Sequence, residues 1–445
     1  MIEKIAMKQM TVILLLCAIL QAQEVSMTKS AEGGLVHNKQ KGRYDIVLRL
    51  PQEANSFDTL FDYAKPFATF RLANVTERRE VVAKPGVERP SNATAFGGVF
   101  GFDTASLYGM HLHLGAYVSQ KIHALNPDNP SNQSNALLNA TASSYTYVGE
   151  ASIAYENSVI QIKAGRIRVD TPYADSDDIR MSPNSFEGAS TYVNISQKWK
   201  VEAFFLTRWA GVDADEVDIF TPLVHDGYGL FGGGITYMLN AENEFSLWVY
   251  NIDKESDIVY AEGAGDLFFS EAFHLEWGLQ GSYIHERSDS AIAGEVVGAM
   301  MIADFDLVYV GLAYNYVFEE NFKSITDGFG GGPYYTSLDE QTIGAISALS
   351  PGHDLGVYRL ALGVDFTQIG VSGLNVEFVH GHFNVGDSPL NAVENDAVIT
   401  YNMTDRWYVE SIYAHGNVRD IDNNIADPES TRNFQRLVTR LDYSF

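Results

Sequence analysis

The chain has 445 residues, and its 57 acidic side chains outnumber the 30 basic ones, giving a formal net charge of −27 at pH 7. Nucleic-acid binding is excluded as its main activity, because neutralising phosphates requires clustered lysine and arginine. A soluble protein of this length normally divides into domains, yet beyond about residue 60 there is no linker, hinge or change of texture.

The first 22 residues have the pattern of a secretory signal peptide. Lys4 and Lys8 precede an apolar run, Met10 to Leu20, that is too short to span a bilayer, and a small residue, Ala22, marks the expected cleavage point. Cys17 is the chain's one cysteine and is removed with this peptide. We therefore predict export, and a mature protein without disulfides or thiolate metal sites.

Residues 23–60 are predicted to form an N-terminal periplasmic segment that leads into the first transmembrane strand. Within them Tyr44, Ile46, Leu48 and Leu50 alternate with polar neighbours. An additional strand at residues 43–50 is the alternative to an ordered periplasmic extension.

Residues 61–445 have a uniform pattern of alternating segments of about ten residues, separated by turns rich in Asn, Asp, Gly and Ser. Successive side chains of a strand point to opposite faces, so each segment has one apolar and one polar face. In residues 199–209, the apolar face has Trp199, Val201, Ala203, Phe205 and Trp209 and the polar face Lys200, Glu202 and Arg208; in residues 274–283, the faces are Leu275, Trp277, Leu279 and Tyr283, and His274, Glu276, Gln280 and Ser282. In residues 308–315, they are Val308, Val310, Leu312 and Tyr314, and Gly311, Ala313 and Asn315. In the last segment, they are Leu437, Leu441, Tyr443 and Phe445, and Arg436, Arg440, Asp442 and Ser444.

This pattern predicts an all-β fold, a transmembrane antiparallel β-barrel of about 18 strands with lipid outside and water inside. No later stretch offers the roughly 20 apolar residues that a helical span requires. A soluble array of β-sandwiches is the alternative, but its dry core would leave the inward polar side chains unsatisfied. The last strand must pair with the first, near Arg71, to leave no free edge.

Three further features are more specific than the alternation of the strands. The final residue, Phe445, ends an aromatic-x-Phe sequence that resembles the C-terminal signature read by the outer-membrane insertion machinery. An internal segment contains Gly-Arg at 165–166, Asp-Thr-Pro at 170–172, Ser-Asp-Asp-Ile-Arg at 176–180 and Pro-Asn-Ser-Phe-Glu-Gly at 183–188. A second segment, residues 330–336, reads Gly-Gly-Gly-Pro-Tyr-Tyr-Thr.

These segments resemble the signature of the OprD family of outer-membrane porins, and the similarity of layout extends over residues 57–445. The resemblance implies an eighteen-stranded barrel with inward-folded extracellular loops, a constriction, and an arginine ladder facing acidic residues. The residues that match the motif and are implied at the constriction are Arg166, Arg168, Arg180, Asp177 and Asp178. The alternative is that these arginines hold the loop to the barrel wall.

Six more basic residues are placed on the lumen side by strand-face alternation alone: Arg71, Lys200, Arg208, Arg359, Arg436 and Arg440. Acidic residues such as Glu202, Glu276 and Asp442 are placed on the lumen side as well. The pattern is therefore as consistent with a wall of mixed charge as with a purely basic wall.

No metal or cofactor is predicted. The acidic stretch Asp420 to Asn424 lacks the glycine and the final glutamate of an EF-hand loop. The pairs His111 with His113 and His380 with His382 share strand faces, but no third ligand accompanies them.

The sequence therefore predicts a porin of the bacterial outer membrane, not an enzyme. Small hydrophilic solutes, carboxylates or amino acids among them, are expected to diffuse passively and with moderate selectivity through an arginine-bearing constriction. Its expected partners are these solutes, membrane lipid and lipopolysaccharide, and the insertion machinery; it is expected to be a monomer or loose trimer. The alternative function is a barrel enzyme, either a protease or a phospholipase.

Overall fold

The computed structural model describes residues 34–38, 43–47, 52–81, 87–129, 132–270, 272–320, 322–419 and 431–445. The predicted signal peptide, residues 1–22, and the acidic stretch Asp420 to Asn424 lie outside the described residues. No helix in the described part of the chain is long and apolar enough to cross a membrane.

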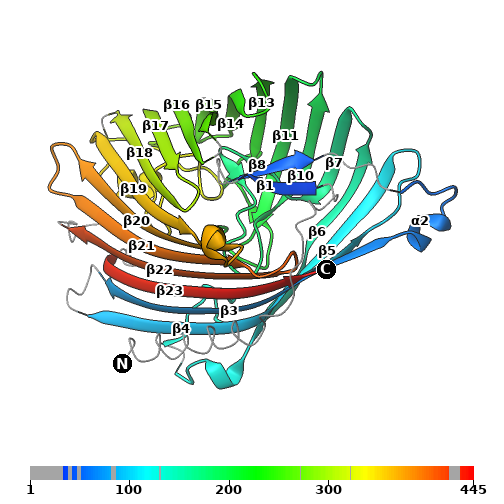
Figure 1. Ribbon diagram of the computed structural model, residues 1–445, viewed down its shortest axis with the longest axis horizontal. Helices are drawn as coiled ribbons and strands as arrows, with labels where there is room; N and C mark the ends of the chain where they lie inside the picture. The colour runs from blue at the N-terminus through cyan, green and yellow to red at the C-terminus, as the bar shows by residue number, and fades with distance from the viewer. Residues whose placement is uncertain are drawn as a thin grey trace.

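Within these residues, eighteen long strands form a closed antiparallel barrel (Figure 1). In chain order they are β3 (Lys65–Val81), β4 (Glu88–Asp103), β5 (Met110–Lys121), β6 (Tyr145–Glu156), β7 (Ile160–Ile167), β10 (Ser185–Asn194), β11 (Trp199–Ala210), β13 (Leu230–Met238), β14 (Asn243–Ile252), β15 (Ser256–Ser270), β16 (Phe273–Glu286), β17 (Gly294–Asp304), β18 (Val308–Glu319), β19 (Leu355–Asp365), β20 (Leu374–Val385), β21 (Asn391–Asn402), β22 (Trp407–Arg419) and β23 (Thr431–Ser444). The predicted all-β barrel of about 18 strands is confirmed.

The barrel closes where the last strand pairs with the first, along what we call the β3–β23 seam. Asp442 lies directly opposite Arg71 in this register, and Ser444 lies opposite Thr69. Every strand therefore has two hydrogen-bonded neighbours, and no edge is left open. The predicted pairing of the terminal strand with the strand of Arg71 is confirmed.

Side chains alternate between an apolar exterior and a largely polar interior. On β18, Leu312 and Tyr314 are about half exposed on the outer face, at 53% and 47%, whereas Asn315 on the inner face is fully buried. Large exposed apolar side chains recur in this way around the barrel. Such an extensive apolar surface is unusual for a water-soluble monomer and suits contact with hydrocarbon.

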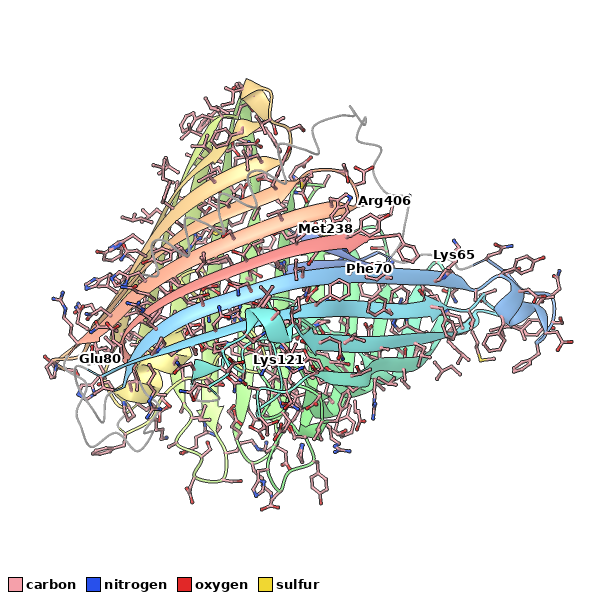
Figure 2. The ribbon with its side chains drawn as sticks, turned by 90° about the horizontal axis from the view of Figure 1, so that it is seen from below. Lys65, Phe70, Glu80, Lys121, Met238 and Arg406 are labelled. Atoms are coloured by element: carbon pink, nitrogen blue, oxygen red, sulfur yellow. The ribbon has the colours of Figure 1, made fainter. Side chains whose placement is uncertain are left out.

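The two ends of the barrel differ in the length of their connections. Figure 2 shows Lys65 and Arg406 at one end and Glu80 at the other. The end with Lys65 has short turns and carries outward aromatic contacts, such as Trp199 with Tyr237 at 4.6 Å and Phe273 with Phe305 at 4.9 Å. Short turns are typical of the periplasmic end of such barrels, and an aromatic girdle is typical of either membrane interface.

One predicted side-chain orientation is wrong. Trp209 was expected on the outer face, but it is buried in the inner core and contacts Phe329 with ring centroids 5.4 Å apart. The cause is a β-bulge. In the pairing of β10 with β11, Gly188 lies opposite Leu206 but Glu187 lies opposite Arg208, so one residue of β11 is skipped and the alternation shifts.

The N-terminal residues that are described form no part of the barrel wall. Strands β1 (Gly34–Asn38) and β2 (Arg43–Val47) pair with each other in a separate two-stranded sheet. The periplasmic location of residues 23–60 remains a prediction. The remaining short elements are α2 (Thr59–Asp62), η1 (His123–Leu125), β8 (Asp170–Thr171), β9 (Ala174–Asp175), β12 (Thr221–Pro222), α3 (Ile343–Leu349) and η3 (Phe366–Ile369).

Placing an arginine on the outer face should destabilise the barrel. Leu360, near the middle of β19, is exposed on that face, whereas its neighbour Arg359 points inward. Leu360→Arg should lower the free energy of unfolding by about 2–4 kcal/mol, the cost of a cationic side chain at the bilayer midplane. Urea titration of the protein refolded into lipid vesicles measures it.

The matched control is Leu360→Phe, which keeps an apolar side chain at the same position and should cost less than about 1.5 kcal/mol. Equal losses in the two variants would contradict a lipid-facing position for Leu360.

Candidate functional site

Two long connections fold into the barrel and contact each other there. The β7–β10 loop (residues 168–184) contains β8 and β9, and the β18–β19 loop (residues 320–354) contains α3, which lies inside the ring of strands in Figure 1. The backbone N–H of Asp175 donates to the carbonyl of Phe329 at 2.8 Å, and the N–H of Phe329 donates to the carbonyl of Tyr173 at 3.0 Å. The loops therefore support each other through backbone hydrogen bonds.

Glycine is required where these loops approach closely. Gly328 has φ of +79°, a left-handed conformation, and a Cβ added there would lie 2.4 Å from the carbonyl oxygen of Tyr173. A side chain at this position would therefore be strained and would push the loops apart.

Tyr173 anchors the loop pair to the inner wall of the barrel. Its side chain is buried, and its hydroxyl lies 2.6 Å from the hydroxyl of Ser282 on β16 and 2.7 Å from that of Tyr334 on the β18–β19 loop. Around it the rings of Tyr250 and Tyr260 make edge contacts from β14 and β15. The loops are thus packed against inward-facing side chains and occupy part of the lumen.

On the opposite wall, Arg71 binds the β7–β10 loop to the β3–β23 seam. Its guanidinium donates to both carboxylate oxygens of Asp442, at 2.8 and 2.7 Å, and to Asp178 Oδ1 at 2.6 Å. It also donates to the backbone carbonyl of Arg180 at 2.5 Å. Because Arg71 is almost fully buried and its donors are engaged, its structural role is to hold the loop in place.

Arginines continue along the seam and hold the second loop as well. Arg440 lies 3.0 Å from Glu410 and donates to the backbone carbonyl of Asp178. Arg436 donates through Nε to Asp339 of the β18–β19 loop at 3.2 Å. Arg79, farther along β3, lies 2.8 Å from Glu340 of the same loop. Both inward loops are therefore fastened to one basic stripe of the wall.

Arg180 differs from these residues. It is buried beside the seam, and its guanidinium donates to the carbonyl of Ile179 at 3.2 Å. Among the described residues no carboxylate lies within ion-pair distance of it. Arg168 lies one residue beyond the end of β7 and is half-buried. The predicted group of Arg71, Arg440, Arg180 and Asp178 is thus brought together by the fold.

Two of the predicted arginines lie instead at the rim where β7, β10 and β11 end. Arg166 donates to Glu187 at 3.1 Å and lies over the ring of Phe220, and Arg208 lies 3.6 Å from the same Glu187. Because of the bulge opposite Glu187, strand alternation no longer places Arg208 in the lumen. A pore-lining role for either residue remains a prediction.

Arg359 is inward-facing on a different part of the wall, on β19. It donates to Glu377 of β20 at 3.0 Å, and Glu377 also accepts from the hydroxyl of Tyr309 at 2.7 Å. Arg359 therefore forms part of a paired cluster separate from the seam.

Two acidic side chains next to the β18–β19 loop were not among the residues predicted from the sequence. Glu394 on β21 is fully buried and accepts the backbone N–H groups of Glu340 and Gln341 at 2.9 and 2.8 Å, and Asp396 lies two residues on along the same face. The alternation of β21 contained this signal, since residues two apart on a strand share a face.

The two neighbouring aspartates of the β7–β10 loop have opposite pKa shifts. Burial and the nearby carboxylate of Asp213 raise the pKa of Asp177 to about 7. Burial alone would raise the pKa of Asp178 as well, but the Arg71 guanidinium outweighs it and holds that pKa below its usual range. Asp178 is therefore a permanent anion near neutral pH, whereas Asp177 titrates there.

These features define a class of protein: an antiparallel β-barrel with an apolar exterior, a charged lumen and inward loops. Neither a protein-family model nor a curated protein sequence matches the chain. Solved structures do match. Pseudomonas aeruginosa OpdK with vanillate aligns with a TM-score of 0.68 and 15% identity over 87% of this chain and 99% of that chain. P. aeruginosa OpdL aligns with a TM-score of 0.66 and 13% identity, over 86% of this chain and 99% of that chain. Acinetobacter baumannii OccAB3 aligns with a TM-score of 0.70 and 13% identity, over 86% of this chain and 99% of that chain.

The fold is therefore that of the OprD-family porins, as the motifs at residues 165–188 and 330–336 predicted.

The pKa of Asp177 predicts pH-dependent ion selectivity. Because the pKa of this carboxyl is raised, it is neutral below about pH 7 and charged above it. Lowering the pH from 8 to 6 should make the channel more permeable to anions, with a midpoint near 7, as measured by the reversal potential in a salt gradient. Asp177→Asn should remove this transition. A transition that persists unchanged in the variant would contradict the assignment.

Asp178 is expected to control how firmly the β7–β10 loop is held. Asp178→Ala leaves the buried Arg71 with one carboxylate partner instead of two, so the loop should loosen locally. Single-channel recordings should show frequent current fluctuations that the wild type lacks. The control is Asp215→Ala, which removes an exposed carboxylate in the β11–β13 loop (residues 211–229). This variant should leave the current trace unchanged.

Proposed function

We propose that this protein is an outer-membrane channel through which small hydrophilic solutes diffuse passively. Support comes from the closed barrel, its apolar exterior and its polar interior, which together suit a water-filled passage through a lipid layer. The fold shared with OpdK, OpdL and OccAB3 adds to this support. Association with lipopolysaccharide, insertion through Phe445 and a monomeric or loosely trimeric state remain predictions.

The observation that carries the proposal is the basic stripe of the seam, against which both inward loops are fastened. Arg71, Arg436 and Arg440 are committed to holding the loops. We propose that Arg180, which has no carboxylate within ion-pair distance among the described residues, offers its guanidinium to solutes together with Arg168, which lies earlier in the same motif. A guanidinium binds a carboxylate through two parallel hydrogen bonds, so carboxylates are the proposed preferred solutes.

A selective channel must also release what it binds. Acidic side chains lie close to this group, since Asp177 and Asp178 precede Arg180 in the loop. The negative charge of Asp178 offsets part of the attraction between Arg180 and an anion, which keeps any single site weak. The structure of OpdK with vanillate, an aromatic carboxylate, suggests benzoate-type anions as the first solutes to test.

Planar-bilayer recording of the wild type beside Arg180→Ala and Arg168→Ala tests this proposal. Each variant should shift the anion-to-cation permeability ratio toward cations by about two- to fivefold, as expected from losing one charge within several ångströms of the ion path. The matched control is Arg406→Ala, which removes an exposed arginine in the turn between β21 and β22. This variant should leave the permeability ratio unchanged.

A strong cation preference that neither substitution alters would overturn the role of these arginines. Absence of conductance, together with hydrolysis of a peptide or a lipid by the reconstituted protein, would favour the alternative barrel enzyme.

A further inference from the structure

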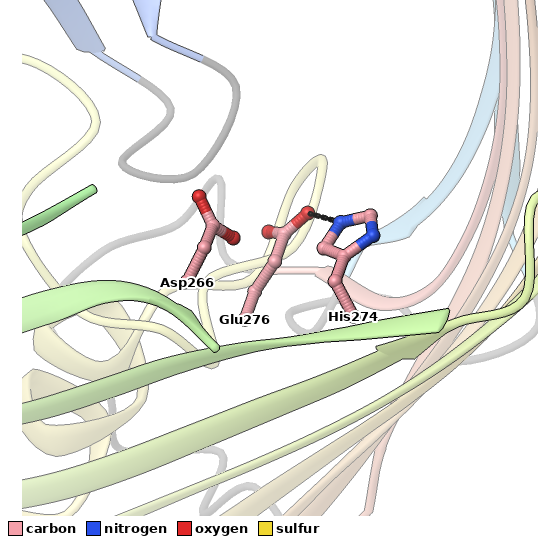
Figure 3. Close-up of side chains that lie close together, drawn as sticks. All are labelled: Asp266, His274 and Glu276. Atoms are coloured by element: carbon pink, nitrogen blue, oxygen red, sulfur yellow. Dashed lines mark ion pairs between the residues drawn. The ribbon is translucent and has the colours of Figure 1, made fainter. Parts of the chain in front are cut away.

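A histidine and three carboxylates lie together on the inner wall, near the short-turn end of β15, β16 and β17. Figure 3 shows Asp266, His274 and Glu276 rising on the same side of neighbouring strands. In the strand register Glu276 lies opposite Asp266, and His274 lies opposite Asp304 of β17. The barrel topology therefore gathers one imidazole and three carboxylates from three adjacent strands.

The distances within this group are slightly longer than those between ligands around a shared ion. Candidate ligand atoms of Asp266, His274 and Glu276 all lie within 4.8 Å of one another. His274 Nε2 lies 3.7 Å from Glu276 Oε1 and 3.9 Å from Asp304 Oδ2, both too long for hydrogen bonds. Two atoms bound tetrahedrally to one zinc ion lie about 3.4 Å apart, so small side-chain adjustments would complete the coordination.

Neighbouring groups orient two of these side chains. The ring of Phe268 stacks on the His274 imidazole, with centroids 5.3 Å apart. The backbone N–H of Asp306 donates to Asp304 Oδ1 at 2.8 Å, which leaves Oδ2 on the side of His274. Such outer contacts fix the direction of a ligand before a metal binds.

The charge of the group also favours a cation. Glu276 and Asp304 form ion pairs only with His274 among the described residues, and their side chains remain 19% and 26% exposed. Carboxylates on neighbouring strands repel one another, and the His274 nitrogen lies beyond hydrogen-bonding distance of Glu276 and Asp304. A divalent cation entering from the lumen would relieve this repulsion.

A second inward histidine shows what a satisfied arrangement looks like. His113 has Asp103 at 2.6 Å from Nδ1 and Glu150 at 3.0 Å from Nε2, one carboxylate at hydrogen-bonding distance on each nitrogen. His274 instead has two carboxylates facing the same nitrogen at longer distances. The difference separates a hydrogen-bonded histidine from a candidate ligand.

We propose that Asp266, His274, Glu276 and Asp304 bind a divalent transition-metal ion of the zinc class on the lumen wall. A mixed set of one imidazole nitrogen and several carboxylate oxygens suits such ions, whereas calcium and magnesium prefer oxygen ligands alone. The bound ion ties β15, β16 and β17 together at the short-turn end and adds positive charge there. This inference goes beyond the proposed channel function and does not depend on it.

The test is zinc binding by the full-length barrel refolded in detergent and stripped with a chelator. Titration of zinc chloride against a fluorescent zinc indicator should show one tight site per barrel. His274→Ala and Glu276→Gln should each weaken binding about tenfold or more. His285→Ala removes an exposed histidine farther along the same strand and should bind zinc as the wild type does.

Heat-modifiable migration in gel electrophoresis checks that every variant is folded, and Glu276→Gln preserves the shape of the side chain it replaces. Lack of stoichiometric zinc binding by the wild type, or unchanged affinity in both site variants, would overturn the proposal. Calcium competing as well as zinc would overturn the transition-metal assignment. Because no transport is measured, failure here leaves the channel proposal untouched.

Discussion

The pairing of β23 with β3 is the interaction on which the rest of the structure depends. Without it the barrel would have two open edges, whose backbone N–H and C=O groups have no partners in a lipid layer. Arg71 lies buried across this junction and bonds to Asp442 on one side and to Asp178 on the other. One side chain therefore links the closing seam of the wall to the β7–β10 loop.

The inward loops follow from the size of the barrel. Eighteen strands enclose a wide lumen, and the inner faces of β13 to β20 carry apolar side chains that need covering. The β7–β10 and β18–β19 loops supply that cover through Tyr173, Phe329 and Tyr334. Acidic residues elsewhere in the two loops, Asp178 and Glu340, form ion pairs with arginines of the seam. Apolar packing and ion pairing thus hold the same loops from two sides, which is how the lumen gains a charged and structured interior.

The candidate site was only partly predictable. The motif at residues 165–188 located the loop, and strand alternation placed Arg71 and Arg440 on the inner wall, where the structure has them. Alternation failed for Trp209 because a bulge depends on pairing with β10, which no local pattern reveals. Glu394 went unnoticed because its importance comes from a loop more than fifty residues away in the sequence.

By itself the sequence determined the fold class, the approximate number of strands, the closing pair and the family whose fold the chain shares. It did so because alternation with a period of two is a local property, and because turns and motifs are contiguous. Only the tertiary structure decided which arginines hold the loops, and that His274 faces carboxylates from two other strands. These outcomes depend on distances between residues remote in sequence, which the register of eighteen paired strands sets and no single segment contains.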